Sequence, residues 1–265
     1  MIKISIITIT YNSEKTLEQT ILSVINQDYE NIEYIIIDGG STDGTINLIK
    51  KYQPKISYWH SEKDKGIADA MNKGIAAATG DIIGIIHSDD FYEPNAFKQV
   101  AECFKNTNAD IICGNLQMWK NGNLDYIFLS NPLNIKYDMT INHPTVFVKK
   151  NAYIKLGNFN TEYKYSMDYD LLLRFYLNGA KFTNINSVLA NMRLDGISDR
   201  NWHKSMFEMF KIKLKNKISF LSALFYFIKQ FIRMSISRLL LKLKLEFIIE
   251  IYRKYFSIMK KQKIK

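Results

Sequence analysis

Apolar runs of strand length alternate with amphipathic segments of helix length over residues 1–106. Four runs rich in β-branched residues predict strands at Ile4–Ile9, Tyr34–Ile37, Ile56–His60 and Asp81–His87. Between them, apolar positions at helical spacing predict helices over Leu17–Gln27, Ile46–Ile49 and Ala68–Ala78. Because the strands are apolar on both faces and alternate with helices, the pattern predicts an α/β fold with a mostly parallel central sheet and helices on both sides.

The pattern is looser after residue 106. Its clearest elements are strands at Ile111–Cys113 and Thr145–Val148 and a helix over Asp168–Asn178. Because no repeat or linker divides residues 1–203, we expect them to form one domain. Residues 204–265 are then a basic helical tail.

The charge of the chain is distributed unevenly. The 265 residues have a formal net charge of +10, yet residues 1–200 hold 20 Lys or Arg against 23 Asp or Glu, and residues 201–265 hold 16 against 3. A neutral-to-acidic body argues against a nucleic-acid partner, and the basic tail is expected to meet an anionic one.

Several features indicate a cytoplasmic protein. Cys103 and Cys113 are the only cysteines, which argues against a disulfide scaffold or a zinc ribbon and fits a reducing compartment. The apolar start of the chain, up to Ile9, is too short for an export signal. The longest apolar run, Ile218–Ile228, falls short of the roughly 18 to 20 residues that cross a bilayer.

Acidic residues follow two of the predicted strands. Asp38 ends the second, and Asp89 and Asp90 follow the fourth. Although a single Asp at a strand end is also a common turn residue, ligands of open parallel sheets bind outside the carboxyl ends of the strands. Adjacent carboxylates beside Ser88 suit a hard divalent cation, which would in turn hold a diphosphate.

Two classes of diphosphate-binding protein are excluded by their missing motifs. The junction of the first strand and helix, Thr8–Ser13, has no glycine, and the glycine-rich turn Gly39–Gly44 follows the second strand. A dinucleotide-binding dehydrogenase needs G-x-G-x-x-G at the first junction, and a P-loop ATPase needs G-x-x-x-x-G-K-S/T, which the chain lacks.

A set of motifs in order along the chain resembles family 2 glycosyltransferases. The motifs are Ile4–Ser13, Tyr34–Gly44, Ser61–Gly74, Ser88–Asp90, His143–Pro144, Ser166–Arg174 and Met192–Ser198. The resemblance covers residues 3–200 and is closest to bacterial transferases of capsule, O-antigen or colanic-acid assembly. It implies a GT-A fold, a nucleotide-diphosphate sugar as donor and inversion at the anomeric carbon.

The resemblance also implies a donor site. Thr10 and Tyr11 match positions that hold the nucleotide base, on which an aromatic ring can stack. Asp38 matches an acid that contacts the base or ribose, and Lys65 matches a cation near the nucleotide. Tyr11 as a packing residue and Lys65 as a solvated lysine remain open alternatives.

Asp89 matches the last acid of the family's D-x-D metal motif, with Asp90 beside it, which implies bound Mn²⁺ or Mg²⁺. The first position of the motif is His87 instead of Asp. We interpret His87 as a packed residue or a sugar contact more readily than as a ligand, because a hard cation prefers oxygen. His143 is expected near the acceptor or the donor sugar.

Asp168 matches the general base of the family, although Met167 replaces the Glu that normally precedes it. The base would take a proton from the acceptor hydroxyl as that oxygen attacks the anomeric carbon. A cap or helix-dipole partner is the alternative for both Asp168 and Asp170, and it is the interpretation we prefer for Asp170.

The sequence also predicts the manner of transfer. The Q-x-x-R-W motif and the membrane spans of the family's processive polymerases are absent, so we expect one sugar to be added per acceptor. That acceptor is expected to be a saccharide or a lipid-linked molecule.

Apolar residues in the tail recur at helical spacing, at Leu221, Leu224, Phe225, Ile228, Phe231 and Ile232. With Lys229 and Arg233 on another face, they predict a basic amphipathic helix that contacts the inner surface of the membrane. The alternative is a helix packed on the body or on a second subunit.

Two rival functions remain. A nucleotidyltransferase normally carries a glycine-rich, Arg-containing loop after the first strand, which Thr8–Ser13 lacks. A non-catalytic, membrane-associated scaffold with a degenerate transferase body is the second rival, and His87 and Met167 keep it open. Donor turnover distinguishes a scaffold from an enzyme.

Overall fold

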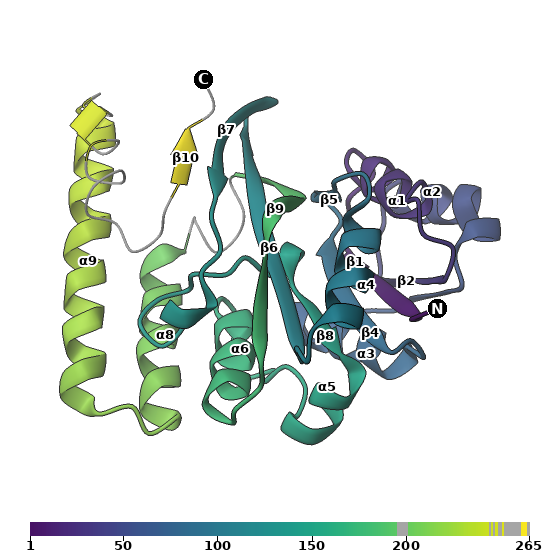
Figure 1. Cartoon of the computed structure of the whole chain (residues 1–265). Helices are drawn as coiled ribbons and strands as arrows, with labels where there is room; N and C mark the ends of the chain where they lie inside the picture. Colours follow the sequence, from purple (N-terminus) through teal and green to yellow (C-terminus); the bar gives the residue numbers. More distant parts are fainter. Residues whose placement is uncertain (195–200, 244, 246, 249–250, 252–260, 264–265) are drawn as a thin grey trace.

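A ten-stranded sheet runs through the molecule in the order β10-β7-β6-β8-β4-β1-β2-β3, with β9 pairing β5 and β6 beside this path (Figure 1). The structure is a computed structural model that describes residues 1–194, 201–243, 245, 247–248, 251 and 261–263. Helices cover both faces of the sheet, and the two helices α8 and α9 lie beyond it on one side.

The N-terminal half of the sheet is parallel, as predicted. Its strands are β1 (Ile4–Thr10), β2 (Ile32–Asp38), β3 (Tyr58–Ser61) and β4 (Ile82–His87). The helices between them are α1 (Leu17–Ile25), α2 (Thr45–Tyr52) and α3 (Ile67–Ala77), and the short η1 (Gln53–Lys55) precedes β3.

Side chains of β1 and β2 alternate between two cores, one on each face of the sheet. Ile7 and Ile9 pack in the core that contains residues of α3 and α6, whereas Ile4 and Ile6 pack with α1, α2 and α4. All seven residues of β1 are buried. This two-sided burial is why the strand sequences are apolar without alternation.

The C-terminal half of the sheet is mixed. Its strands are β5 (Phe91–Tyr92), β6 (Ile111–Lys120), β7 (Asn123–Phe128), β8 (Phe147–Lys149), β9 (Phe182–Arg193) and β10 (Lys261–Lys263). β8 is antiparallel to both β4 and β6, and β9 is parallel to β6. The predicted strand Thr145–Val148 is divided, because its first residue closes a 3-10 turn before β8 begins.

The remaining helices complete the domain and begin the tail. They are α4 (Ala96–Asn106), α5 (Lys150–Leu156), α6 (Met167–Leu177), α8 (Trp202–Lys215) and α9 (Phe220–Lys242), with the short helices η2 (Pro132–Asn134) and η3 (His143–Thr145). α8 packs on the body, since Ile212 is fully buried in the core that also contains α6. The predicted boundary between the domain (residues 1–203) and the tail (residues 204–265) stays a prediction. No helix among the described residues is both long and apolar enough to cross a membrane.

Candidate functional site

The carboxyl ends of β1 to β4 form one edge of the sheet, where the sequence predicts the donor site. Thr10 is paired with Asp38, Asp38 with Ser61, and Ile9 with His87. β1 lies between β2 and β4, so the acids after the second and fourth strands lie two strands apart along the same edge.

Asp38 holds the turn that follows β2. Its fully buried carboxylate accepts hydrogen bonds from the backbone N–H of Gly40 at 3.0 Å, from the backbone N–H of Ser41 at 2.8 Å and from the hydroxyl of Ser61 at 2.7 Å. The Ser41 hydroxyl donates a further bond. Three of these bonds end on Oδ2 and one on Oδ1, so the carboxylate fixes the turn from both oxygens.

An exposed aromatic ring and an unpaired hydroxyl lie at the end of β1. Tyr11 is 61% exposed, and the buried hydroxyl of Thr10 has no hydrogen-bond partner among the described residues. Asn12 has a φ of 48° and accepts the N–H of Thr42 on its side chain at 2.9 Å. This bond ties the loop after β1 to the loop after β2.

Gly39 marks a close approach of three loops. A Cβ there would lie 2.5 Å from the carboxylate of Asp64 and 3.5 Å from the ring of Tyr11. Lys65 follows Asp64, is exposed, and donates its backbone N–H to Asp69 at 3.1 Å. The loops therefore gather Tyr11, Asp64 and Lys65 at one place, although the sequence analysis did not include Asp64.

The two acids after β4 have different environments. Asp89 is exposed. The carboxyl of Asp90 is 3% exposed and accepts the backbone N–H of Arg193 at 3.3 Å. Burial, with the charge of Asp89, raises the pKa of Asp90 well above its usual range. Beside them, the hydroxyls of Ser13 and Ser88 are 2.7 Å apart and join the ends of β1 and β4.

Asp89 could hold a divalent cation through its one exposed carboxylate. Its exposed carboxylate is the kind of oxygen ligand that Mn²⁺ and Mg²⁺ bind, whereas Asp90 would first have to turn away from Arg193. The described residues contain no cluster of three or more His, Cys, Asp or Glu side chains that could hold a metal ion. A cation held at Asp89 would thus need further oxygen ligands besides these side chains, such as water or a bound diphosphate.

Arg193 is a cation that the sequence analysis did not select. From the end of β9, its guanidinium donates to the backbone carbonyl of Asp89 and to the side chain of Gln19, and lies 5.5 Å from the ring centre of Phe91. It belongs to the motif Met192–Ser198, whose residues 195–198 lie outside the described residues. Motif membership was the signal that could have identified it.

The structure brings His87 and His143 together. Their rings lie edge to face, with centres 6.3 Å apart, and the ring of Phe159 is 5.6 Å from that of His143. Burial lowers the pKa of His87, against the opposing charge of Asp89, and burial next to His87 lowers the pKa of His143 to about 3. Both rings are therefore neutral at neutral pH and can exchange hydrogen bonds with sugar hydroxyls.

Asp168 is the second residue of α6 and is partly buried. Burial raises its pKa to about 6, the N–H of Tyr169 at 2.8 Å opposes that rise, and the charge of Glu208 adds to it. A carboxylate with this pKa is ionised at neutral pH and still basic enough to accept a proton. Among the described residues, no hydrogen bond or ring contact links Asp168 to the strand-end residues.

Glu208 of α8 organises the loop before Asp168. Its carboxylate accepts the backbone N–H groups of Lys164, Tyr165 and Ser166, at 3.0, 2.8 and 2.9 Å. The Ser166 hydroxyl also lies 2.8 Å from that of Ser205. The sequence analysis missed Glu208 because it lies in the tail, far from the motifs.

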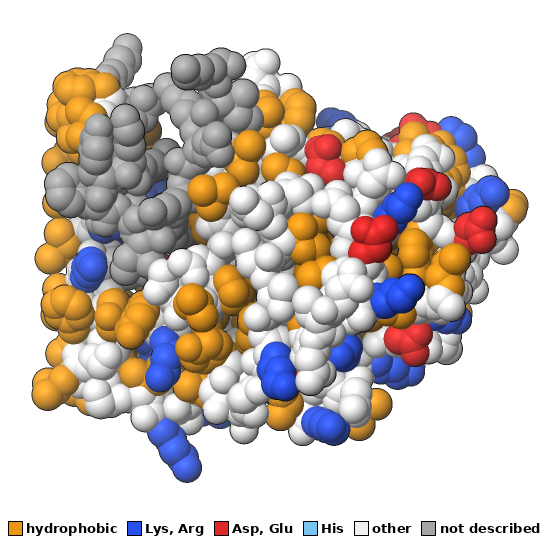
Figure 2. Space-filling model, viewed as in Figure 1, with side chains coloured by type: hydrophobic (Ala, Val, Ile, Leu, Met, Phe, Trp, Pro, Cys, Tyr) orange, Lys and Arg blue, Asp and Glu red, His pale blue; other side chains and the backbone are white. Residues whose placement is uncertain are grey.

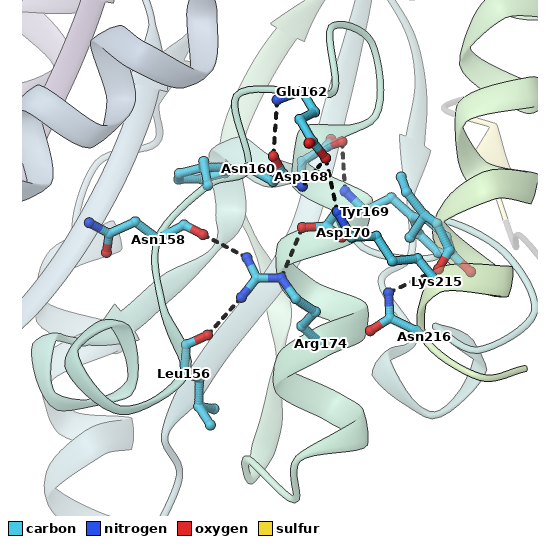
Figure 3. Close-up of polar contacts among 12 residues, drawn as sticks. Leu156, Asn158, Asn160, Glu162, Asp168, Tyr169, Asp170, Arg174, Lys215 and Asn216 are labelled. Carbon is cyan, nitrogen blue, oxygen red and sulfur yellow. Dashed lines mark hydrogen bonds and ion pairs between the residues drawn. The ribbon is translucent and has the colours of Figure 1, made fainter.

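Asp170 has a structural partner. Its carboxylate, which is 2% exposed, pairs with Arg174 at 2.9 Å (Figure 3). The same guanidinium donates to the carbonyls of Leu156 and Asn158, at 2.7 and 2.6 Å. Asp170 therefore joins α6 to the end of α5 through Arg174. It lies in the first turn of α6, where a helix-dipole partner was expected, but the described residues form no side-chain capping hydrogen bond there, so its main contact is the ion pair.

The sequence of this chain is similar to those of known glycosyltransferases. The family model described as glycosyl transferase family 2 matches residues 5–169. An uncharacterized glycosyltransferase of Mycobacterium tuberculosis is 30% identical over 210 residues, which are 77% of this chain and 80% of the relative. A PGL/p-HBAD biosynthesis glycosyltransferase of Mycobacterium bovis is 27% identical over 191 residues, 70% of this chain and 74% of the relative.

Solved structures show the same fold. TarS of S. aureus, residues 1–349, superposes with a TM-score of 0.65 at 19% identity, covering 97% of this chain and 76% of that one. A mannosyltransferase of Pyrobaculum calidifontis, solved with GDP-Man and Mn²⁺, gives 0.66 at 16% identity, covering 85% and 70%. The expected GT-A fold is therefore confirmed, and with the match to residues 5–169 the chain belongs to glycosyl transferase family 2.

Proposed function

We propose that this glycosyltransferase moves one sugar from a nucleotide-diphosphate donor, with a UDP-sugar favoured, to a saccharide or lipid-linked acceptor in cell-surface polysaccharide synthesis. The observation that carries the proposal is the edge of the sheet, where exposed Tyr11 and exposed Asp89 follow strands β1 and β4. Related folds solved with UDP-GlcNAc and with GDP-Man support a nucleotide-sugar donor of the hexosyl or N-acetylhexosaminyl type.

In the proposed donor site, the ring of Tyr11 stacks on the base and the unpaired hydroxyl of Thr10 hydrogen-bonds to the nucleotide. Lys65 and Arg193 place positive charge near the diphosphate. Asp38 contributes chiefly by holding the turn after β2, because its carboxylate already accepts four hydrogen bonds.

The proposed chemistry is a single displacement with inversion. Asp168 takes the proton of the acceptor hydroxyl while that oxygen bonds to the anomeric carbon. The bond from this carbon to the phosphate oxygen breaks, and the nucleoside diphosphate leaves with the electron pair. His87 and His143, whose rings lie edge to face, would orient sugar hydroxyls.

Asp89, with Asp90 if its side chain turns, would hold the Mn²⁺ or Mg²⁺. This ion supplies positive charge that stabilises the departing diphosphate. The Mn²⁺ in the complex of the Pyrobaculum calidifontis enzyme supports this choice of metal.

The proposed location is cytoplasmic, on the inner face of the cell membrane. No nucleic-acid partner is proposed, because the excess of positive charge is confined to the tail. At the membrane face the enzyme would meet a lipid-linked acceptor.

Thermal unfolding with UDP, GDP and dTDP, each with and without Mn²⁺, tests the donor site. A ligand that binds the folded chain raises the melting temperature by mass action. We expect one nucleotide to raise it in a Mn²⁺-dependent way, and the matching sugar donor to release nucleoside diphosphate when an acceptor is supplied. No shift with any nucleotide would favour the non-catalytic scaffold instead.

A further inference from the structure

α9 presents an apolar face to solvent. Six residues of this helix and its C-cap, Leu243, recur at spacings of three and four and form one stripe. We name these seven residues the α9 stripe: Leu221, Phe225, Ile228, Ile232, Ile236, Leu239 and Leu243. Their side chains are between 46% and 79% exposed. Figure 2 shows apolar side chains along the edge of the molecule that α9 forms.

The opposite face of α9 is fixed against the protein, so the stripe has a defined direction. Ala223 is fully buried, and the ring of Phe227 lies 5.4 Å from that of Phe210 in α8. Arg233 pairs with Asp138 at 3.5 Å. These contacts lie on the side turned away from the stripe, and Figure 1 shows α8 between α9 and α6.

The apolar tail residues predicted at helical spacing all lie in α9, but not all of them belong to the stripe. Leu221, Phe225, Ile228 and Ile232 belong to the stripe, as the helical spacing predicted. The other two predicted residues lie beside the stripe: Leu224 is half-buried, and the ring of Phe231 lies 5.5 Å from that of Trp202.

All charged side chains of α9 are positive. The helix carries Lys229, Arg233, Arg238 and Lys242 and no acidic residue. Lys229 and Lys242 are exposed beside the stripe. Two copies joined stripe to stripe would bring these lysines together without an acid on either α9 to pair with them. Lipid phosphates would pair with them.

We propose that the α9 stripe is a docking surface for an anionic bilayer, with its apolar side chains inserted among the headgroups and Lys229 and Lys242 paired with lipid phosphates. α9 then lies in the interface along its length. The choice of a lipid-linked acceptor rests on the proposed function, but the binding of lipid does not. Docking would hold the start of α6, and so Asp168, at a fixed distance from the membrane through α8.

Sedimentation of the full chain with vesicles tests this surface. The vesicles are phosphatidylcholine alone or phosphatidylcholine mixed with phosphatidylglycerol, at low and high salt. The stripe variant combines Phe225→Ser, Ile232→Ser and Leu239→Ser, and the charge variant combines Lys229→Glu and Lys242→Glu. The control variant combines Leu133→Ser and Ile154→Ser, whose side chains are 75% and 72% exposed outside α9.

We expect the wild type and the control to sediment with the anionic vesicles at low salt and less so at high salt. The stripe variant should partition at least roughly tenfold less, and the charge variant should lose the preference for anionic lipid. Wild type that stays in the supernatant, or a stripe variant that sediments equally well, would overturn the proposal. A stripe variant that binds vesicles normally but changes from dimer to monomer would assign the stripe to a second copy.

Nucleotide-induced thermal shifts of the same preparations separate the two proposals. A nucleotide shift without vesicle binding would overturn the membrane surface and the proposed location at the membrane, and would leave the donor site in place. Vesicle binding without any nucleotide shift would overturn the proposed donor site and leave the α9 stripe in place.

Discussion

The carboxylate of Glu208 accepts the backbone N–H of Ser166 at 2.9 Å, two residues before Asp168 in the chain. Glu208 belongs to α8, so a helix of the basic tail holds the loop from which the proposed base projects. The same carboxylate raises the pKa of Asp168 through its charge. Glu208 thus acts on the proposed base by position and by charge.

Glu208→Gln should lower kcat several-fold and move the acidic limb of the pH profile to lower pH. The amide has one oxygen for three backbone donors, so the loop before Asp168 loses support. Loss of the negative charge also lowers the pKa of Asp168. The pH dependence of kcat measures both effects. Glu162→Gln is the matched control, because Glu162 is exposed and pairs with Lys215; an unchanged profile in Glu208→Gln would contradict the positioning role.

Asp168→Asn should reduce sugar transfer by about 10²- to 10⁴-fold, because the amide cannot accept the acceptor's proton. Nucleotide binding should be retained, since no contact among the described residues joins Asp168 to the strand ends. In the wild type, kcat should rise with pH as Asp168 loses its proton near pH 6. Turnover measured across pH tests the loss of transfer and the rise of kcat, and the nucleotide-induced thermal shift of the variant tests retained binding. Full activity of the variant would remove Asp168 from the role.

Asp168→Asn should also stabilise the protein at pH 8 relative to the wild type. The folded-state pKa of about 6 lies above the ordinary 3.8, so the ionised carboxylate is disfavoured by folding. The stability contributed by protonated Asp168 is present below pH 3.8 and is lost as the pH rises through 6. Melting temperatures at pH 5 and pH 8 measure the difference, which should be larger at pH 8. Asp170→Asn should instead lower the melting temperature, because it breaks a buried pair with Arg174.

Tyr11→Ala should weaken nucleotide binding by roughly 1 to 3 kcal/mol, the range measured for the stacking of a base on an aromatic ring. The ring is 61% exposed, so the melting temperature without ligand should change little. Tyr11→Phe keeps the ring and should bind normally. Titration calorimetry compares the two with Tyr58→Ala, a control tyrosine that is 47% exposed. If all variants bind the nucleotide with equal affinity, the nucleotide base does not stack on Tyr11.

Asp89→Asn should abolish the Mn²⁺-dependent part of the nucleotide thermal shift and lower kcat by about a hundredfold or more. Asn keeps the size of the side chain but removes the charge that holds a hard cation. Asp28→Asn is the control, because that side chain is 80% exposed and lies in the loop between α1 and β2, where the chain enters β2. A variant that keeps its Mn²⁺ response would exclude Asp89 as a ligand.

The sequence predicts the parallel half of the sheet well because β1, β2 and β4 are buried on both faces and read as continuous apolar runs. It does not predict β9. Phe182–Arg193 is only partly buried over most of its length, so its apolar signal is weak. Its pairing with β6 joins segments about 70 residues apart, as in the contact between Asn115 and Asn186. Such a pairing depends on tertiary packing, which a local pattern of apolar residues does not predict.

Some residues of the candidate site could likewise be predicted from the sequence, and others could not. Thr10, Asp38 and Asp89 could be placed at one edge of the sheet because parallel strands bring their carboxyl ends together. Glu208 and Arg193 could not, because each acts on a segment far from it in sequence: Glu208 is 42 residues from Ser166, and Arg193 is 104 from Asp89. His87 and His143 were selected separately, and only the fold shows that their rings meet.

α8 lies between α6 and α9, so a restraint on α9 can be transmitted through α8 to the loop that precedes α6. One of its faces carries Glu208, which supports the loop before Asp168, and another carries Phe210, which packs against α9. If the docking of α9 restrains α8, the enzyme should show interfacial activation: turnover of a water-soluble acceptor should increase when anionic vesicles are added. By reciprocity, any ligand that orders the loop before Asp168 should tighten the attachment of the whole enzyme to the bilayer.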